Sequence, residues 1–409
     1  MLRFYSASNG VVNSEKAMYN CLELALAERG EAVYQQELLI VIHTTIGHDF
    51  TALLSAAHQR CPQATVVGCT CAGVIGIEGA NENMRALGIM VAEAEKKGEF
   101  GIAYCDNIRG YNSYQKAREM AEILKAETPG VNMVHILASG IDIAADRALE
   151  GVADVFGNEI PVFGGTSSDN MRAISTYQFV NCQILERGAI MIGYADPSLK
   201  VEMGVHHGSV PVGRPLTVTR SRANQVFELD GQPAWSLLME KLSLPENSPP
   251  GPCIPVAGLA ELLPDEYHQT YDNQHILRVI VKVDEEDKSF YLPVDCSEGT
   301  RLWLTQRDEN LIFSGLERMI QLLSERIEGQ ETVAVFHTDC AARGRAMFNK
   351  IVKDEIIEKM QSPLMKGRRL PWLGMYGFGE FTKLNGKNLF HNYTTSIYAL
   401  VRRSTHVKE

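Results

Sequence analysis

The sequence lacks any segment that would anchor it in a membrane or direct it out of the cell. No stretch approaches the ~18 uninterrupted apolar residues that a transmembrane helix needs. The start of the chain, MLRFYSASNGVVNSEK, has no basic segment followed by an apolar run, which is the pattern of a secretory signal. We therefore expect a cytoplasmic protein without membrane insertion.

An excess of positive charge is also missing. The chain has 39 Lys and Arg against 50 Asp and Glu, a formal net charge of −11. Nucleic-acid binding depends on cationic side chains that neutralise phosphates, so we expect no nucleic-acid partner. A hydrophobic content of 45% with 22% charged residues is ordinary for a globular protein. The length of 409 residues exceeds the ~250–300 at which one core stops growing, which predicts two domains.

Signatures of catalysis and of metal binding are absent as well. The nine cysteines are odd in number and scattered without a CxxC pair, which favours a reducing compartment over a disulfide framework. No GxSxG elbow, HExxH, CxxCH, GxGxxG before a helix or GxxxxGK[ST] loop occurs. Cys340, with His337 before it and Arg343 after it, is the best nucleophile candidate. We predict that the chain is not an enzyme, with a thiol-dependent enzyme as a less favoured alternative.

The chain does contain a weak internal repeat. One unit runs LLIVIHTT, DFTALLSAAHQR, ATVVGCTCAG, and the next runs NMVHILASG, AADRALEGVADVF, IPVFGGTSSDN. A longer third copy runs ETVAVFHTDC, GRAMFNKIVKDEIIEKM, LPWLGMYGFGE. Each predicts a buried strand, a polar turn, a helix and a second parallel strand reached by a right-handed crossover. An offset of 96 residues superposes Gly68 on Gly164 and, at the first strand, His43 on Ser139.

The segments after these units alternate apolar and polar residues, as in TYQFVNCQI and HNYTTSIYAL, and predict antiparallel strands. The fold class we expect is α/β (mixed α+β), with repeated strand-helix-strand units forming mixed sheets covered by helices. The boundary between the two domains is placed near Arg220–Asn224, which divides the chain into 1–222 and 223–409.

The turns that follow the first strand of each unit are the expected ligand site. Ligands of open α/β sheets bind beyond the carboxyl ends of the strands. The turns IHTTIGHD, ILASGID and FHTDCAARG supply convergent Thr, Ser, Asp and His side chains, although each could instead cap the following helix. We expect one shared pocket between the domains, lined by Thr44, Ser139, Gly164, Gly165, Thr166, Asp169, Cys340 and Arg343.

The adjacent histidines His206 and His207 precede a Gly/Pro turn, which suits either a strand-end pair or an axial haem ligand. Because neighbouring side chains of a strand point to opposite faces, only one of them can enter a given pocket. His43 and His337 open two of the equivalent turns and are the reserve candidates for holding a metal.

Six short motifs, in order, carry a family resemblance: VVGCTCAGVIG, VFGGTSSDN, HHGSVPVG, LDGQPAW, FHTDCAARG, and GMYGFGEF followed by LFHNYTTSIYAL. Together they resemble the FIST-domain proteins, a prokaryotic sensory family with an amino-terminal FIST and a carboxy-terminal FIST_C part. The resemblance implies a sensor of small molecules such as amino acids, coupled to kinases or cyclic-di-GMP enzymes. With no kinase segment beside the two parts, the chain looks like the stand-alone members. These include haem-binding nitric oxide sensors that regulate a separate histidine kinase or diguanylate cyclase.

Two motifs depart from the family pattern. TDCAARG stands where relatives tend to have SCNxRG, so Cys340 and Arg343 match but Ala341 replaces the Asn. HHGSVPVG stands where many relatives have a GCRPxG-like turn. The loss of an amide and the gain of histidines favour haem b held by His206 or His207, with a gas such as nitric oxide as the ligand. A sensor of amino acids or similar metabolites without haem is the alternative, and the chain is compatible with a homo-oligomer.

Overall fold

The structure is a computed structural model that describes residues 1–27, 29, 37–245, 247–345 and 348–403. Its chain follows one order of elements three times: strand, helix, strand, helix and four strands. The first copy contains β1 (Leu2–Asn9), α1 (Ser14–Ala27), β2 (Leu38–Thr44), α2 (Phe50–Arg60), β3 (Thr65–Thr70), β4 (Val74–Gly76), β5 (Gly79–Asn81) and β6 (Leu87–Ala94). The second contains β7 (Phe100–Cys105), α3 (Ser113–Glu127), β8 (Met133–Ser139), α4 (Ala145–Phe156), β9 (Val162–Ser167), β10 (Tyr177–Val180), β11 (Gln183–Glu186) and β12 (Ala189–Tyr194).

The third copy has the same order but carries an insertion after its first strand. It contains β13 (Leu199–His206), α8 (Glu309–Arg326), β22 (Gln330–Cys340), α9 (Lys350–Met365), β23 (Trp372–Gly377), β24 (Gly379–Leu384), β25 (Lys387–His391) and β26 (Thr395–Arg403). The insertion contains β14 (Ser209–Arg222), β15 (Gln225–Leu229), β16 (Gln232–Pro233), α5 (Ala234–Lys241), α6 (Pro250–Cys253), β17 (Leu259–Leu262), α7 (Asp265–Tyr271), β18 (His275–Arg278), β19 (Lys282–Asp284), β20 (Ser289–Tyr291) and β21 (Arg301–Arg307). Short 3₁₀ turns lie at Gly110–Asn112, Ile254–Val256 and, as η3, at Ala341–Arg343.

The three copies exchange strands in a cycle. The sheet of the first copy runs β1-β6-β2-β3 and is extended by β10 and β11 of the second copy. The sheet of the second copy, β7-β12-β8-β9, is extended by β24 and β25 of the third. The sheet of the third, β13-β26-β22-β23, is extended by β4 and β5 of the first. This closed exchange arranges the copies around a pseudo-threefold axis, while the insertion forms a fourth sheet, β18-β17-β21-β14-β15-β20-β19, with β16 paired to β15.

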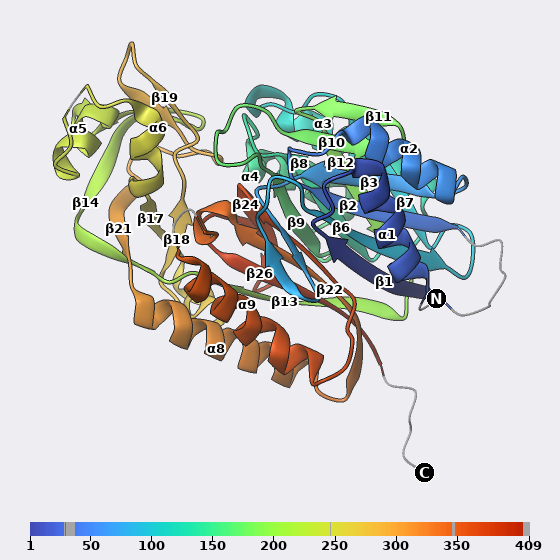
Figure 1. Cartoon of the computed structure of the whole chain (residues 1–409). Coiled ribbons are helices and arrows are strands. Elements are labelled where there is room, and N and C mark those ends of the chain that lie inside the picture. The colour runs from blue at the N-terminus through green and yellow to red at the C-terminus, as the bar shows by residue number, and fades with distance from the viewer. Residues whose placement is uncertain (28, 30–36, 246, 346–347, 404–409) are drawn as a thin grey trace.

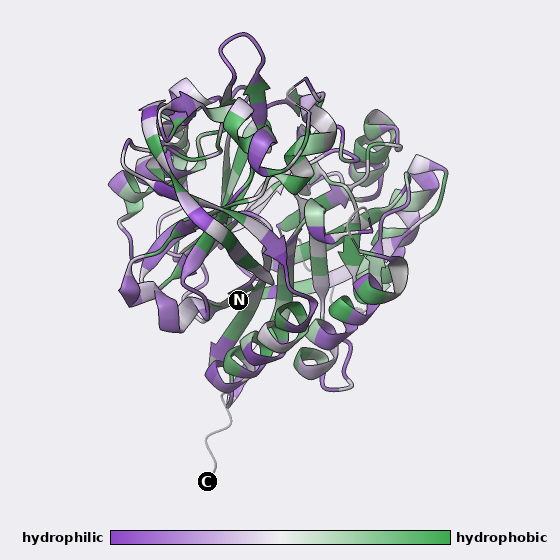
Figure 2. Cartoon of the chain, turned by 90° about the vertical axis from the view of Figure 1, so that its left-hand side faces the viewer, coloured by the Kyte–Doolittle hydropathy of each residue, from purple (hydrophilic) through white to green (hydrophobic). Residues whose placement is uncertain are grey.

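A central core lies where the three sheets face one another. Alternate residues of the buried strands point into it, for example Val41 of β2, Leu137 of β8 and Phe336 of β22. The residues between them pack under the helix pairs α1 with α2, α3 with α4, and α8 with α9. Figure 1 shows these pairs on the outside of the sheets, with the insertion to one side. Strands that are buried on both faces have nearly continuous apolar sequences. Figure 2 shows such hydrophobic strands inside the molecule.

The expected fold class of mixed sheets covered by helices is confirmed. Each parallel pair, β2 with β3, β8 with β9 and β22 with β23, has an antiparallel neighbour in β6, β12 or β26. The boundary expected at 222/223 lies in the turn between β14 and β15, which pair with each other. No helix among the described residues combines the length and the apolar character needed to cross a membrane.

The superposition of His43 on Ser139 is wrong by two residues. Ile42 pairs with Gly68 and Ile136 pairs with Gly164, so the offset of 96 holds for β3 and β9 but not for β2 and β8. Counted from these pairings, Ser139 corresponds to Thr45. In the third copy His337 pairs with Gly374, which makes Cys340 the counterpart of both. Between the paired residues the chain is two residues longer in the second copy, from Ile136 to Gly164, than in the first, from Ile42 to Gly68, and sequence spacing alone could not detect that difference.

Candidate functional site

The carboxyl ends of β3, β9 and β23 meet at the pseudo-threefold axis. Three equivalent backbone hydrogen bonds join them, from Ser168 N–H to Thr70 O (3.1 Å), from Ala72 N–H to Tyr376 O (3.0 Å) and from Phe378 N–H to Thr166 O (3.1 Å). The backbone groups at the axis are therefore occupied by the fold itself. They do not form a cradle of free N–H groups for a phosphate.

The glycines at this point serve close packing. Gly68, Gly164 and Gly374 are equivalent, and a Cβ on Gly164 would lie 2.3 Å from the carbonyl oxygen of Ile136. Gly164 also has a φ of 116°, which L side chains rarely adopt. A Cβ on Gly165 would lie 2.5 Å from Thr338. Of the residues expected to bind a ligand, Gly164 and Gly165 thus contact their own neighbouring strands.

Four further residues of the expected ligand site bind the chain itself. Thr166 is buried beside Gly379, and the Asp169 carboxylate accepts N–H groups from the backbone of the loop that follows it. Thr44 Oγ1 donates to Ala86 O (3.2 Å), and Ser139 Oγ lies 3.1 Å from Thr176 Oγ1. In the turn between β2 and α2, the Asp49 side chain caps the N-terminus of α2. Helix capping is the alternative role that the sequence allows for these turns.

Cys340 and Arg343 are brought together at the end of β22. Cys340 packs against Ala260 and Leu277 of the insertion and against Tyr393. Burial raises the pKa of the Cys340 thiol, so the reactive thiolate is not available near neutral pH. Arg343, at the end of η3, donates from Nε to Asp339 Oδ1 at 2.8 Å. Its Nη2 is buried without a partner among the described residues.

Arg343 belongs to a cluster that we name the charged junction: Glu82, Arg307, Asp339, Arg343 and Lys353. These residues come from three parts of the molecule, the loop after β5, the end of β21 in the insertion, and the β22–α9 segment. Glu82 and Lys353 form an ion pair at 3.2 Å, with side chains only 8% and 5% exposed. Buried charges are rare in proteins unless they are paired or bind something, so the junction is a candidate functional site.

The junction is held by further contacts. Arg307 donates from Nη2 to Ala342 O at 2.9 Å. The ring of Phe348 lies near both guanidinium groups, with its centroid 5.2 Å from Cζ of Arg307 and 6.0 Å from Cζ of Arg343. Burial raises the pKa of Asp339 to about 6, although Arg343 opposes the shift. Sequence reasoning found Arg343 but missed the other four members; the Asp of FHTDCAARG was the one signal available within the motif.

The two histidines expected to hold haem, His206 and His207, form hydrogen bonds with the backbone of the protein. His206 Nε2 lies 3.1 Å from Leu311 O, and His207 Nε2 lies 2.9 Å from His275 O. A carbonyl oxygen can only accept, so each Nε2 carries a hydrogen. The Nδ1 of His207 accepts the Ser209 N–H. Burial lowers the pKa of both rings, that of His207 to about 4, so both are neutral.

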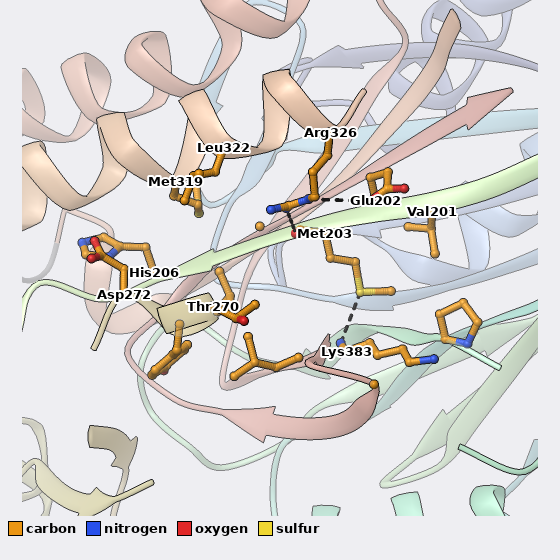
Figure 3. Close-up of a pocket in the computed structure, with 16 residues that line it drawn as sticks. Val201, Glu202, Met203, His206, Thr270, Asp272, Met319, Leu322, Arg326 and Lys383 are labelled. Atoms are coloured by element: carbon orange, nitrogen blue, oxygen red, sulfur yellow. Dashed lines mark hydrogen bonds and ion pairs between the residues drawn. The ribbon is translucent and has the colours of Figure 1, made fainter. Parts of the chain in front are cut away.

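A pocket of about 240 Å³ adjoins His206 but not His207, which agrees with the expectation that one of the two faces a given pocket. In Figure 3, Met319, Leu322 and Arg326 approach it from α8, opposite Met203 of β13. Arg326 donates to Met203 O and lies 3.6 Å from Glu202.

The residues beside His206 do not fit haem in this structure. Pockets for drug-sized ligands and cofactors span roughly 300–1,000 Å³, more than this pocket offers. Both ring nitrogens of His207 are used, and so is Nε2 of His206. The described part of the chain also contains no group of three or more His, Cys, Asp or Glu arranged for a metal ion. That observation concerns metal ions held by the protein alone, because haem iron is held by one or two side chains.

The reserve histidines lie on opposite sides of the buried sheets. His337 points toward α8 and α9, lies against Trp372 and bonds Thr395 Oγ1 at 2.8 Å. His43 points into the central core, and neither ring nitrogen has a partner among the described residues. Burial lowers the pKa of His43 to about 4 and that of His337 to about 3. His43 and His337, the two reserve candidates, therefore do not share a site.

Comparison with known proteins identifies the family of the chain. A FIST N domain model matches residues 37–232 and a FIST C domain model matches residues 235–383. The chain belongs to the FIST family. FIST domains are sensory domains for small ligands in signal transduction, so the expected sensory family is confirmed.

Among the relatives, an uncharacterised protein of Mycobacterium bovis is 23% identical over 401 residues, 96% of this chain and 98% of its own length. An uncharacterised protein of Methanocaldococcus jannaschii is 22% identical over 218 residues, 52% of this chain and 42% of its own. The crystal structure of a cyanuric acid hydrolase from A. caulinodans aligns over 99% of this chain and 100% of its own, with 8% identity. Its TM-score is 0.37, which is too low to support an argument about function.

Proposed function

We propose that this FIST protein is a small-ligand sensor that binds its ligand at the charged junction and passes the signal to a separate protein. The observation that carries the proposal is the buried Nη2 of Arg343, which has no partner among the described residues. A buried, unsatisfied donor on a charged group is costly and is rarely left so in a native protein. A ligand that accepts a hydrogen bond from Arg343 would remove that cost.

The position of the junction supports a sensory role. Arg307 belongs to the insertion, Glu82 to the first copy, and Arg343 and Lys353 to the third. A ligand bound among them would change how the insertion packs on the three-sheet body. A ligand shifts a conformational equilibrium only through different contacts in the two states, and a junction of three parts supplies such differences.

The partner proposed for the output is a separate histidine kinase or cyclic-di-GMP enzyme, as the family resemblance implies. The protein itself is proposed to have no turnover, because Cys340, the best nucleophile of the sequence, is a buried thiol whose pKa is raised. Haem b and nitric oxide remain a prediction from the resemblance. That prediction is tested by Soret absorbance of the purified protein, with His206→Ala and His207→Ala compared singly.

The test of the proposed site is a thermal-shift screen of small metabolites against three proteins: wild type, Arg343→Gln, and the control Arg118→Gln. Arg118 is exposed on α3 and pairs only with its neighbour Glu122 across one helical turn. A ligand of the junction raises the melting temperature of wild type and Arg118→Gln but not of Arg343→Gln. A ligand that stabilises all three equally binds elsewhere and overturns the assignment of the site. Arg343→Lys serves as the second variant if Arg343→Gln does not fold.

A further inference from the structure

The two arginines of the charged junction carry more positive charge than their surroundings balance. Arg307 and Arg343 both lie near the ring of Phe348, and among the described residues only Asp339 forms an ion pair with either. Arg307 has the carbonyl oxygen of Ala342 as its hydrogen-bond acceptor. Burial lowers the pKa of Arg307, and repulsion by the Arg343 guanidinium adds to the shift. Two partly or fully buried like charges favour an anion between them.

The hydrogen-bonding groups around the arginines are mostly donors. The hydroxyls of Tyr376 and Tyr393, like Nη2 of Arg343, are buried without a partner among the described residues. Tyr376 lies in the electrostatic field of Asp339 and Arg343, and Tyr393 in that of Arg307. A guanidinium can only donate hydrogen bonds, so it offers no acceptor atom to the hydrogens of the two hydroxyls. A ligand that satisfies this set brings acceptor oxygens.

One carboxyl group nearby requires separate treatment, because an ionised carboxylate could itself supply the missing acceptor. Glu380 Oε2 accepts from Thr394 Oγ1 at 2.6 Å, and Glu380 Oε1 is buried without a partner among the described residues. Burial raises the pKa of Glu380 well above its ordinary value, which favours the neutral form of the group. A neutral Glu380 adds no counter-charge, so Asp339 supplies the one ion pair that the described residues give the two arginines.

We propose that the ligand is an anion whose carboxylate is held between the guanidinium groups of Arg307 and Arg343, beside Phe348. The planar fork of a guanidinium matches the two oxygens of a carboxylate, and such charge-assisted bonds are about twice as strong as neutral ones. The buried, mostly apolar neighbours Cys340, Ala342 and Leu277 strengthen this attraction by keeping water away. The inference rests on the proposed function, because it names the class of ligand for the same site.

The experiment is NMR of the arginine side-chain Nε–H groups in the full chain, with resonances assigned from the single variants. The probes are acetate, its neutral analogue acetamide and inorganic phosphate, each titrated at fixed ionic strength. Acetate is expected to shift the Arg307 and Arg343 signals saturably, whereas acetamide is not. Arg307→Gln should weaken acetate binding at least about tenfold. The matched control is Arg301→Gln, on the same strand, whose guanidinium lies over Trp303 and should leave binding unchanged.

The outcomes separate this inference from the proposed function. If phosphate but not acetate shifts both signals, the carboxylate is wrong. Another outcome is that neither anion shifts the two arginine signals while a neutral metabolite stabilises wild type and not Arg343→Gln. In that case the proposed ligand site is supported, and the inference that its ligand is an anion is wrong. If acetate binds equally well to Arg307→Gln and to wild type, the pairing of the two arginines is wrong. Arg307→Lys, which keeps the charge but loses the fork, should bind acetate more weakly than wild type and provides the test if Arg307→Gln does not fold.

Discussion

The end of β22 differs in kind from the equivalent ends of β2 and β8, although all three strands take the same place in their sheets. Asp339, Thr44 and Ala138 are equivalent, because each pairs with an equivalent residue of the neighbouring parallel strand. Thr44 donates to the carbonyl oxygen of Ala86, and Ala138 has no polar side chain. Asp339 accepts a hydrogen bond from a buried arginine, Arg343. The comparison teaches that the packing of the fold recurs in all three copies, whereas a charge stands at this position in the copy that carries the insertion.

The largest effect should come from breaking the ion pair at the end of β22. Arg343→Met leaves Asp339 buried without its partner and should lower the free energy of unfolding by about 3–5 kcal/mol. The double variant Asp339→Asn with Arg343→Met should recover part of that loss, since no uncompensated charge remains. Urea denaturation of the three proteins measures both effects. A loss below 1 kcal/mol for Arg343→Met would mean that the pair is no more important than a surface ion pair.

The second effect is a pH dependence from Asp339 that the equivalent residues Thr44 and Ala138, which do not titrate, should not show. Because the folded pKa of Asp339 is raised to about 6 from an ordinary value of 3.8, the stabilisation from its protonated form is present below about pH 4 and is lost as pH rises through 6. The loss amounts to roughly 3 kcal/mol. The groups that face Asp339 are His337, Arg343, Tyr376, Glu380 and Thr395.

Asp339→Asn should remove this component from the pH profile of stability between pH 4 and 7. Thr44→Val, at the equivalent place in the first copy, should leave the profile unchanged because it does not titrate. Denaturation midpoints at steps of half a pH unit provide the measurement. An identical slope for Asp339→Asn and wild type would show that another group titrates in this range.

The third effect concerns the close packing at the equivalent glycines of the three copies. Replacement by Ala should be destabilising in all three copies, but by different amounts. Gly164→Ala meets a carbonyl at 2.3 Å and a φ of 116°, so it should cost up to about 3 kcal/mol. Gly68→Ala meets Ile42 O at 2.2 Å without that backbone strain and should cost less. Gly374→Ala, whose nearest neighbour is the His337 side chain at 2.9 Å, should cost least. A different order of melting temperatures among the three variants would contradict this account of the contacts at the glycines.

The smallest effects are expected at the ends of the strands themselves. Ser139→Ala removes a hydroxyl that bonds Thr176 and the backbone of Ile141, and Cys340→Ala removes a buried thiol, so each should cost about 1 kcal/mol. Cys340→Ala should also leave ligand binding measurable by thermal shift. Loss of a demonstrable catalytic rate in that variant, with the fold intact by circular dichroism, would overturn the sensor reading in favour of a thiol enzyme.

Sequence reasoning reached the strands and helices of the repeats but not the members of the functional cluster. Arg343 was found because it lies in a motif with an adjacent Cys. Glu82 and Arg307 precede Arg343 by 261 and 36 residues, in segments without a motif, and they reach it only through folding. Gly164, Gly165 and Asp169 resemble a ligand-binding loop in the sequence. Close strand packing and a backbone turn also favour Gly and Asp, so one sequence does not distinguish ligand binding from local packing.

The sequence by itself determined the three strand-helix-strand units, their antiparallel neighbours and the excess of acidic over basic side chains, because these follow from local periodicity and composition. Tertiary structure alone decided that each copy lends its hairpin to another copy, that Ser139 corresponds to Thr45, and that Glu82, Arg307 and Arg343 lie in one cluster. Those features depend on pairing between strands far apart in the chain. The free energy of such pairing comes from the faces that become buried together, and a single sequence does not reveal which faces those are.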